Sequence, residues 1–196
     1  MTGKDIIKIT LNLVIVYLIG GLILAFVFAK ASPKIYKNNE EAEKKALKEL
    51  MPEADENIKL GDWSIHDKHA KYFVSKKGGD TIGYIIQSFG KGYSSYINTF
   101  VAVDKDFRVQ KINILAHGET PGLGDEIELD YFKDRLKGKD IEHLKVLKTE
   151  TKEYVEAISG ATISSRAVTE DAVKNGVAFL IKTVKEGGNT DVQQQH

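Results

Sequence analysis

The chain has no cysteine among its 196 residues. This absence excludes disulfide bridges, thiolate zinc sites, iron–sulfur ligation, covalent c-type haem and a cysteine nucleophile. The chain also lacks a net charge, because 28 Lys and Arg residues balance 28 Asp and Glu residues. Without a basic field to recruit a polyanion, we expect no nucleic-acid partner. Because cysteine is absent, any redox function must use a cofactor that other residues hold.

A long hydrophobic run near the N-terminus stands apart from the otherwise ordinary globular composition. Ile9–Ala29 contains 21 uncharged residues, of which four are not hydrophobic. As a helix it would span roughly 32 Å, the thickness of a bilayer core. A cleaved signal peptide is the alternative, since Lys4 and Lys8 precede the run and Ala29–Ala31 resembles a cleavage site. Signal cores of about 7–15 residues are shorter, so the length favours an uncleaved anchor. Lysines on both flanks leave its orientation undecided.

Short β-rich segments separated by turn-forming residues follow this run. Residues 76–80 include Gly78-Gly79 and join the first pair of segments, and residues 104–107 join the second pair. Such spacing is typical of β-hairpins in an antiparallel sheet. The expected strands are Tyr72–Ser75, Thr81–Phe89, Thr99–Val103 and Arg108–Leu115.

Apolar residues at helical spacing predict helices on either side of these hairpins. The sequence therefore predicts an α+β fold, in which one N-terminal transmembrane helix precedes a single domain with an antiparallel sheet and packed helices. The expected elements outside the hairpins are an amphipathic helix over Asn38–Leu50, a short helix near Asp130–Leu136, a strand near Lys145–Lys148 and a long helix from about Ser165 to Val184, ended by Gly187-Gly188.

His66 and His69 are three residues apart, a spacing that could place two metal ligands on one helix face. Neither cysteine nor a third ligand at a recognised spacing accompanies them, although Asp62 and Asp67 are nearby. Solvated polar residues are the simpler interpretation. We predict no metal site.

A glycine-rich loop from His117 to Gly124 follows the last expected strand. Pro121-Gly122 suits the central positions of a type II turn, and Gly124 permits another unusual φ, so a structural turn explains the glycines. Equally, glycines let backbone N–H groups approach a flat or anionic ligand closely. The residues of the loop do not decide between these two interpretations.

The segment Ser159–Ser165 directly precedes the long helix. In a structural interpretation, Ser164 or Ser165 is the N-cap of that helix. In a chemical interpretation, small neighbours expose the Thr162 hydroxyl on an accessible turn, and the free N–H groups of the helix start receive a phosphate. Composition alone favours the cap.

The anchor, the Glu119-Thr-Pro-Gly-Leu-Gly124 loop and the Ser159-Gly-Ala-Thr162 turn, in this order, resemble one family. The chain is similar over nearly its whole length to the G subunit of the Rnf complex. That family is related to the C subunit of the sodium-pumping NADH:quinone reductase. Both belong to the FMN-binding domain group, whose flavin is joined through its phosphate to a threonine. Ser164-Ser-Arg-Ala-Val168 is more similar to the Rnf branch.

This resemblance implies that Thr162 carries covalent FMN through a phosphoester, which would make the chain a flavoprotein and a phosphoprotein. One departure is Glu156, which stands where the family's motif usually begins with Asp and which would still serve a docking or metal-proximal role for the modifying enzyme. The resemblance assigns no catalytic residue and no metal ligand. The implied cofactor-binding residues are Thr162, Ser159, Gly160, Ala161, Ser164 and Ser165 in the turn, and Glu119, Thr120, Pro121, Gly122, Leu123 and Gly124 in the loop.

The resemblance also implies a function and partners. We expect an electron-transfer subunit of a membrane-bound ferredoxin:NAD⁺ oxidoreductase that translocates Na⁺ or H⁺, without independent turnover. Its partners would be the other membrane and redox subunits, the lipid bilayer, and a flavin transferase that uses FAD and a divalent metal. The protein would cross the inner (cytoplasmic) membrane once and place its domain outside the cytoplasm.

Two alternatives stay open. One is the C subunit of the quinone reductase, and the other is a membrane-anchored binding module without redox chemistry, in which Thr162 merely lies near a helix cap. The expected division of the chain is a short tail over 1–8, the anchor over 9–29, a linker over 30–37, the FMN-binding domain over 38–188 and a polar disordered tail over 189–196.

Overall fold

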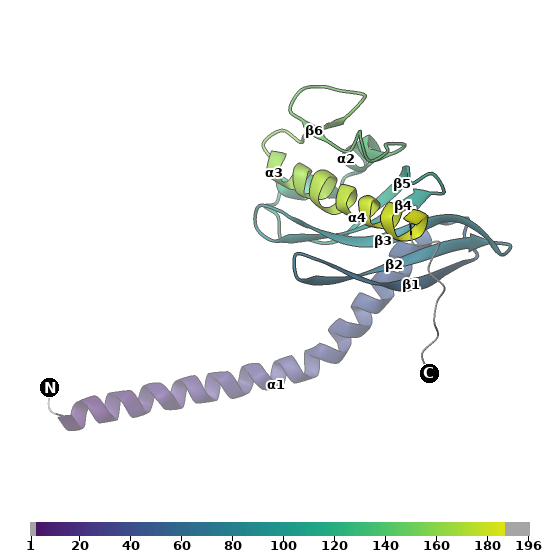
Figure 1. Ribbon diagram of the computed structural model, residues 1–196. Coiled ribbons are helices and arrows are strands. Elements are labelled where there is room, and N and C mark those ends of the chain that lie inside the picture. Colours follow the sequence, from purple (N-terminus) through teal and green to yellow (C-terminus); the bar gives the residue numbers. More distant parts are fainter. Residues whose placement is uncertain (1–2, 187–196) are drawn as a thin grey trace. The chain divides into compact units, whose positions relative to one another are not determined.

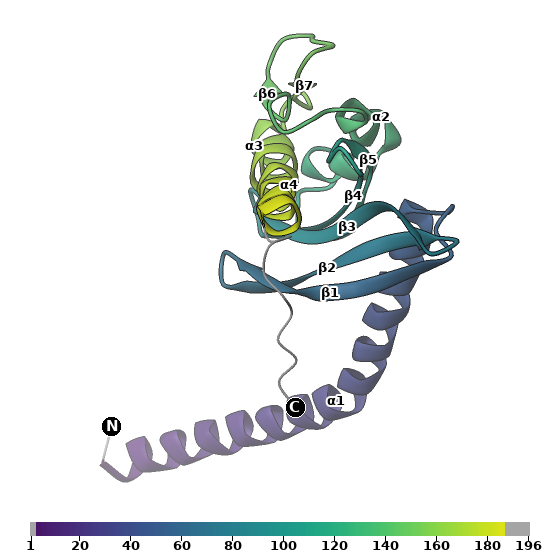
Figure 2. The ribbon, with the colours of Figure 1, turned by 45° about the vertical axis from the view of Figure 1, so that its right-hand side comes forward.

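The computed structural model describes residues 3–186 (Figures 1 and 2). The chain forms two compact units, Met1–Glu43 and Lys44–His196. The tail predicted over 189–196 and the helix end predicted at Gly187-Gly188 lie outside the described residues. The domain boundaries drawn from the sequence stay a prediction.

The first element is the helix α1, which runs without interruption over Gly3–Leu50. The segment 30–37, expected as a linker, is part of this helix, and so is the amphipathic segment from Asn38 onward. Pro33 lies inside the helix and removes one backbone donor without ending it. Among residues 3–186, α1 is the one helix long and apolar enough to cross a membrane.

Five antiparallel strands form a meander in the order β1-β2-β3-β4-β5. Both predicted hairpins are present; the first three of their strands are longer than expected, and the fourth has the expected length but begins one residue later. The first strand was not predicted, because its apolar residues change phase: Ile58 and Leu60 are out of step with Trp63 and Ile65. A bulge between Lys59 and Gly61 accompanies this change. The strands are β1 (Glu56–Ile65), β2 (Lys68–Lys77), β3 (Asp80–Lys91), β4 (Tyr96–Asp104) and β5 (Val109–Ala116).

His66 lies in the tight turn between β1 and β2, so the helix face considered for His66 and His69 is wrong. His66 and Asp67 have φ angles of 52° and 57°, as the two central residues of a type I′ hairpin turn require. The His66 Nε2 lies 2.8 Å from Asp171 Oδ1, so Asp171 on the long helix is its hydrogen-bond partner. Over residues 3–186 there is no group of three or more potential metal ligands.

The segment after β5 contains short helices and a small two-stranded sheet. The short helix and the strand predicted here are present, whereas β7 was not predicted. In chain order the elements are the 3₁₀ helix η1 (Gly124–Glu128), α2 (Asp130–Lys133), the 3₁₀ helix η2 (Asp134–Leu136), β6 (Val146–Leu147) and β7 (Val155–Glu156), of which β6 and β7 pair in parallel.

A long helical run then lies across one face of the large sheet (Figure 1). It begins at Thr162, three residues before the predicted Ser165, so Ser164 and Ser165 lie inside it. The run consists of α3 (Thr162–Arg166), the π-helical segment η3 (Ala167–Val173), α4 (Lys174–Leu180) and the π-helical segment η4 (Ile181–Glu186).

Hydrophobic packing fixes this run on the sheet. Val168, Val173 and Val177 are fully buried among side chains of the sheet, including Ile86 and Val101, and burial of each contributes about 1.5–3 kcal/mol.

Gly90, near the end of β3, permits the close approach of the helix. An added Cβ at Gly90 would lie 1.9 Å from the carbonyl oxygen of Ala167. This contact holds the start of the helical run, with Thr162, beside the turn between β3 and β4.

A second cluster covers the other face of the sheet. Leu47 and Leu50 at the end of α1 pack with Phe73, Ile85 and Phe100. The sheet is thus covered by apolar contacts on both faces, which makes it a rigid support for loops at its ends.

Candidate functional site

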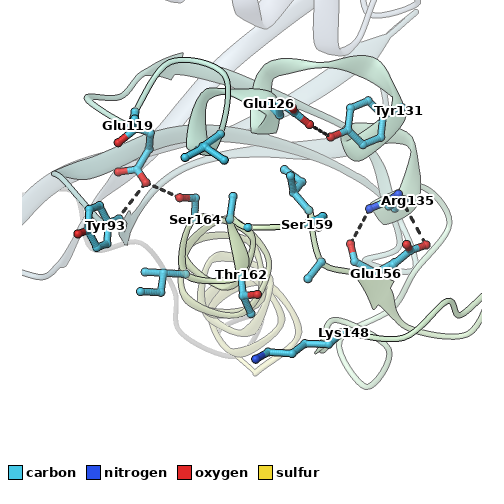
Figure 3. Close-up of a pocket in the computed structure, with 18 residues that line it drawn as sticks. Tyr93, Glu119, Glu126, Tyr131, Arg135, Lys148, Glu156, Ser159, Thr162 and Ser164 are labelled. Atoms are coloured by element: carbon cyan, nitrogen blue, oxygen red, sulfur yellow. Dashed lines mark hydrogen bonds and ion pairs between the residues drawn. The ribbon is translucent and has the colours of Figure 1, made fainter.

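A cavity of about 1220 Å³ opens at the start of the long helical run (Figure 3). It lies between the loop predicted from its glycines and the turn that precedes Thr162. Nine predicted site residues line it, namely Glu119, Thr120, Leu123, Gly124, Ser159, Gly160, Ala161, Thr162 and Ser164. Pro121, Gly122 and Ser165 are not among its lining residues.

The predicted turn at Pro121-Gly122 is present in the loop. The Leu123 N–H donates to the Thr120 carbonyl at 3.2 Å, and Gly122 has a φ of +73°, as the third position of a type II turn requires. The unusual φ expected at Gly124 is wrong, since Gly124 is not among the residues with positive φ. Glycine is needed there for space, because an added Cβ would lie 2.8 Å from the Glu119 Cβ and from the Ser164 Oγ.

A buried carboxylate joins the loop to the helix. Glu119 is 5 % exposed, and its oxygens accept hydrogen bonds from the backbone N–H groups of Tyr93 at 3.1 Å and Ser94 at 3.0 Å. The Ser95 N–H also donates to it, at 3.5 Å. The Ser164 hydroxyl is a further donor (Figure 3). We call Glu119, Ser164 and the backbone of Tyr93–Ser95 the Glu119 clamp.

The clamp holds Glu119 in its ionised form. Burial alone raises the pKa of the Glu119 carboxyl, but the hydrogen bonds from Ser164 and from the backbone of Ser94, Tyr93 and Ser95 outweigh it. The pKa therefore lies below its ordinary value, since donors stabilise the charged form. Glu119 lines the cavity, but its oxygens already have partners, which identifies it as a residue that orders the site.

The turn before the helix has a conformation that requires glycine. Gly160 has a φ of +77°, and an added Cβ there would lie 3.2 Å from Leu123 Cδ2. The loop and the turn therefore touch at Leu123 and Gly160 as well as through the clamp. This contact explains why the two motifs form one site although about 40 residues separate them.

The helix start has no side-chain cap, so the predicted N-cap at Ser164 or Ser165 is wrong. The residue before the helix is Ala161, which has no side-chain acceptor. The Ser165 hydroxyl accepts from the Ile158 N–H at 3.0 Å and donates to the Ala161 carbonyl at 2.9 Å. The Ser164 hydroxyl donates to Glu119. A tertiary contact thus engages Ser164 and local hydrogen bonds engage Ser165, and the first N–H groups of the helix stay free of a side-chain cap.

Thr162 is the first residue of the helical run and lines the cavity. Its side chain is half-buried, and within residues 3–186 its hydroxyl has no hydrogen-bond partner. Ser159 is exposed and also lines the cavity. Because Ser164 and Ser165 are buried and engaged, Thr162 and Ser159 are the hydroxyls of this turn that remain accessible for chemistry.

A chain of polar contacts forms the opposite wall. The Tyr131 hydroxyl donates to Glu126, and Arg135 lies 5.1 Å over the Tyr131 ring. Arg135 also donates to the Glu156 carbonyl oxygen at 2.8 Å, and its Nη2 lies 3.6 Å from Glu156 Oε2 (Figure 3). Burial, followed by the contact with Glu126, raises the pKa of Tyr131 to about 12. Tyr131 therefore stays neutral in the physiological range.

Half of the cavity lining was not assigned from the sequence. Most of these residues come from the short helices after the loop or from the β6–β7 pair, and they reach the cavity through folding rather than through a local motif. The predicted helix near 130–136 contains Tyr131 and Arg135, and the predicted strand near 145–148 contains Lys148, but neither pattern by itself pointed to a cavity. The lining residues missed are Tyr93, Glu126, Tyr131, Arg135, Lys148, Ala157, Ile158 and Ile163, and Glu156 was assigned a different role.

Known proteins resemble this chain in sequence and in structure. The FMN-binding domain family matches residues 92–178, the segment that contributes the cavity lining. The G subunit of the proton-translocating ferredoxin:NAD⁺ oxidoreductase complex of Clostridium ljungdahlii is 34 % identical over 178 residues, which cover 89 % of this chain and 91 % of that protein. The G subunit of the ion-translocating oxidoreductase complex of Methanosarcina acetivorans is 27 % identical over 91 % of this chain and 96 % of that protein.

A solved structure shares the fold. The crystal structure of the C subunit of the Na⁺-translocating NADH-quinone reductase from Parabacteroides distasonis is 25 % identical, with a TM-score of 0.58 over 80 % of this chain and 97 % of that chain. The two G subunits match along most of both chains. The chain therefore belongs to the family of G subunits of the Rnf ion-translocating ferredoxin:NAD⁺ oxidoreductase complexes, and it contains an FMN-binding domain.

Proposed function

We propose that this chain is an electron-transfer subunit of a membrane-bound ferredoxin:NAD⁺ oxidoreductase and that it carries FMN on Thr162 through a phosphoester. The observation that carries the attachment is the Thr162 hydroxyl, which has no partner within residues 3–186 and lies at an uncapped helix start inside a cavity. The family match to FMN-binding domains supports the cofactor.

The residues of the cavity fit this group. A cavity of about 1220 Å³ exceeds the roughly 300–1000 Å³ typical of ligand pockets, so it has room for a flavin nucleotide. The free N–H groups at the helix start suit phosphate oxygens. Leu123 and Tyr131, which are 47 % and 44 % exposed, offer apolar and aromatic surface to a flat ring. FMN supplies reversible electron transfer when bound, and the chain binds and orients it.

The attachment requires one substitution at phosphorus. The Thr162 oxygen forms a bond to the FMN phosphorus of FAD, the pyrophosphate bond breaks, AMP leaves, and the threonine proton passes to a base of the flavin transferase. Glu156 is paired with Arg135, so a docking role for Glu156 toward the transferase would require sharing this carboxylate. The chain itself needs no metal ligand for the reaction, because the transferase brings the divalent ion.

The helix α1 supports the placement in the membrane. Its apolar segment is long enough to span a bilayer, and we propose a single pass with the domain outside the cytoplasm. Protease treatment of sealed inverted vesicles checks this orientation: the domain should be protected inside them. Digestion of the domain in intact inverted vesicles would place it on the cytoplasmic side.

Co-expression with a flavin transferase tests the attachment. Wild-type chain should show in-gel flavin fluorescence after denaturation, and Thr162→Ala should lose it completely while remaining folded. Ser159→Ala is the matched control, because Ser159 is the other accessible hydroxyl in the turn, and it should stay fluorescent. Peptide mass spectrometry should place the FMN adduct on the peptide containing Thr162.

Three results would contradict the proposal. Fluorescence retained in Thr162→Ala, or an adduct on a neighbouring serine, would move the attachment point. A wild-type chain that is never modified in the presence of active transferase would favour a binding module without redox chemistry.

A further inference from the structure

The charged side chains that line the cavity differ in whether they have partners. Glu119 is held in its clamp, Glu126 accepts from Tyr131, and Arg135 pairs with Glu156. Lys148 also lines the cavity, but in the described part of the chain it has no hydrogen bond or ion pair. The cavity therefore contains one unpaired charge, and that charge is positive.

The β6–β7 pair places Lys148 beside the turn that carries Thr162. Lys148 follows β6 directly, and the Ala157 N–H donates to the Leu147 carbonyl at 2.8 Å. The Val146 N–H donates to Glu170 on the long helix at 2.7 Å, which holds β6 against that helix. Figure 3 shows the Lys148 side chain running past the helix start near Thr162. The backbone of β6, directly before Lys148, is thus held by hydrogen bonds.

We propose that Lys148 is a positioning residue that holds the phosphate of FMN at the start of the helical run. This inference rests on the proposed function, because it names the residue that recognises the phosphate at that same site. Lys148 and Thr162 line the same cavity, so the ammonium group and the free N–H groups of the helix start can offer donors to one phosphate.

The pairing of the charges that line the cavity supports this role of Lys148. Three carboxylates, Glu119, Glu126 and Glu156, line it together with the cations Arg135 and Lys148. The formal charge of this lining is −1, and removal of Lys148 would make it −2; because Arg135 is already engaged by Glu156, Lys148 is the cation that can meet an incoming phosphate. A long flexible lysine stem also lets the ammonium follow the phosphate before and after the bond to Thr162 forms.

The test compares FMN with riboflavin, which lacks the phosphate. The full-length chain is made without transferase and kept in detergent, and quenching of flavin fluorescence reports the dissociation constants of both compounds. Wild type should prefer FMN about tenfold. Lys148→Gln should lower this preference about fivefold, as expected for one exposed ion pair, without changing the affinity for riboflavin.

Two further variants complete the design. Lys148→Arg keeps the charge and should retain most of the preference for FMN. Lys145→Gln removes a nearby exposed lysine that does not line the cavity, and its preference should equal that of wild type.

The proposal is overturned if Lys148→Gln weakens FMN and riboflavin equally, if it leaves the preference unchanged, or if Lys145→Gln has the same effect. It is also overturned if wild-type chain binds FMN no better than riboflavin, or binds neither. Loading of Thr162 by the transferase is scored separately on the same chains. Failure of loading contradicts the covalent attachment, whereas an unchanged FMN preference in Lys148→Gln contradicts the role of Lys148 even when loading succeeds.

Discussion

The two motif-bearing walls of the cavity differ in how their polar groups are satisfied. On the loop wall, every oxygen of the buried Glu119 carboxylate accepts a hydrogen bond within the clamp. On the wall at the helix start, the Thr162 hydroxyl and the Lys148 ammonium have no partner in residues 3–186, and the helix has no side-chain cap. The polar groups of the loop wall have their hydrogen-bond partners without a ligand, whereas the wall at the helix start offers free donors to one.

The energetic cost of burial explains this difference. A buried carboxylate without partners would be strongly destabilising, so the fold must supply donors for Glu119. Thr162 is half-buried and Lys148 is exposed, so water can satisfy them at little cost. Unsatisfied groups at such positions are available to a ligand, whereas satisfied groups order the site. Mutations on the two walls should therefore affect different properties.

The largest loss of stability is expected from a substitution in the Glu119 clamp. Glu119→Gln replaces a charged acceptor by an amide whose NH₂ faces backbone donors, and it should cost about 3 kcal/mol and lower the thermal midpoint by roughly 10 °C. Glu142→Gln, at an exposed position, is the control and should leave the midpoint unchanged. Equal midpoints for both variants would show that the clamp does not stabilise the fold.

The stabilisation from Glu119 should depend on pH. Its folded pKa lies below the ordinary value of 4.5, so its contribution is complete above that value and is lost as the pH falls through the folded pKa. Urea midpoints of wild type and Glu119→Gln should therefore differ most near neutral pH and converge in acid. A difference that stays constant from neutral pH into acid would mean that the ionised carboxylate is not the source of the stability.

Replacing two glycines of the same loop by alanine should lower the free energy of unfolding, by an intermediate amount for one and by a small amount for the other. An added methyl group at Gly124 would meet Glu119 and Ser164 at 2.8 Å, so Gly124→Ala should cost about 2 kcal/mol by overpacking. Gly122 has open space around it but a φ of +73°, so Gly122→Ala should cost about 1 kcal/mol from the backbone alone.

Flavin absorbance separates the same two variants. Gly124→Ala should also alter the visible spectrum of loaded protein, since Gly124 lines the cavity. Gly122→Ala should leave that spectrum as in wild type, because Gly122 does not line the cavity. The opposite order of stabilities, or a spectral change confined to Gly122→Ala, would contradict the geometry of this loop.

The smallest effect is expected on the wall that contains Tyr131. Tyr131→Phe removes the hydroxyl that donates to Glu126 and should cost about 0.5–1 kcal/mol. Because the pKa of Tyr131 is raised to about 12, wild type and variant should show the same tyrosinate absorbance until the pH approaches that value. An earlier difference in absorbance would show that Tyr131 ionises as an ordinary tyrosine.

Local patterns in the sequence were sufficient for several elements. The turn residues Gly78 and Gly79 and the four residues after Val103 marked both hairpins correctly, because turn chemistry is specified by adjacent residues. The apolar run of α1 was equally clear. The strand β1 escaped prediction because Ile58 and Leu60 are out of step with Trp63 and Ile65, which breaks the alternation on which such a prediction depends.

The helix start illustrates where local patterns fail. Ser164 and Ser165 have the chemistry of an N-cap, so composition placed the helix start at or after them. In the fold, Ser164 donates to Glu119, which is 45 residues away, and Ser165 bonds to the turn before the helix. With both hydroxyls engaged elsewhere, the helix begins at Thr162.

The sequence by itself determined the long apolar helix, the antiparallel hairpins and the presence of two small-residue motifs, because each depends on residues that are neighbours in the chain. Tertiary structure decided which groups of those motifs are engaged and which are free. It joined Glu119 to Ser164, and it brought Arg135 and Lys148 into the cavity from elements without a motif. The partners of a buried charge are selected by packing in space, and no local pattern encodes them.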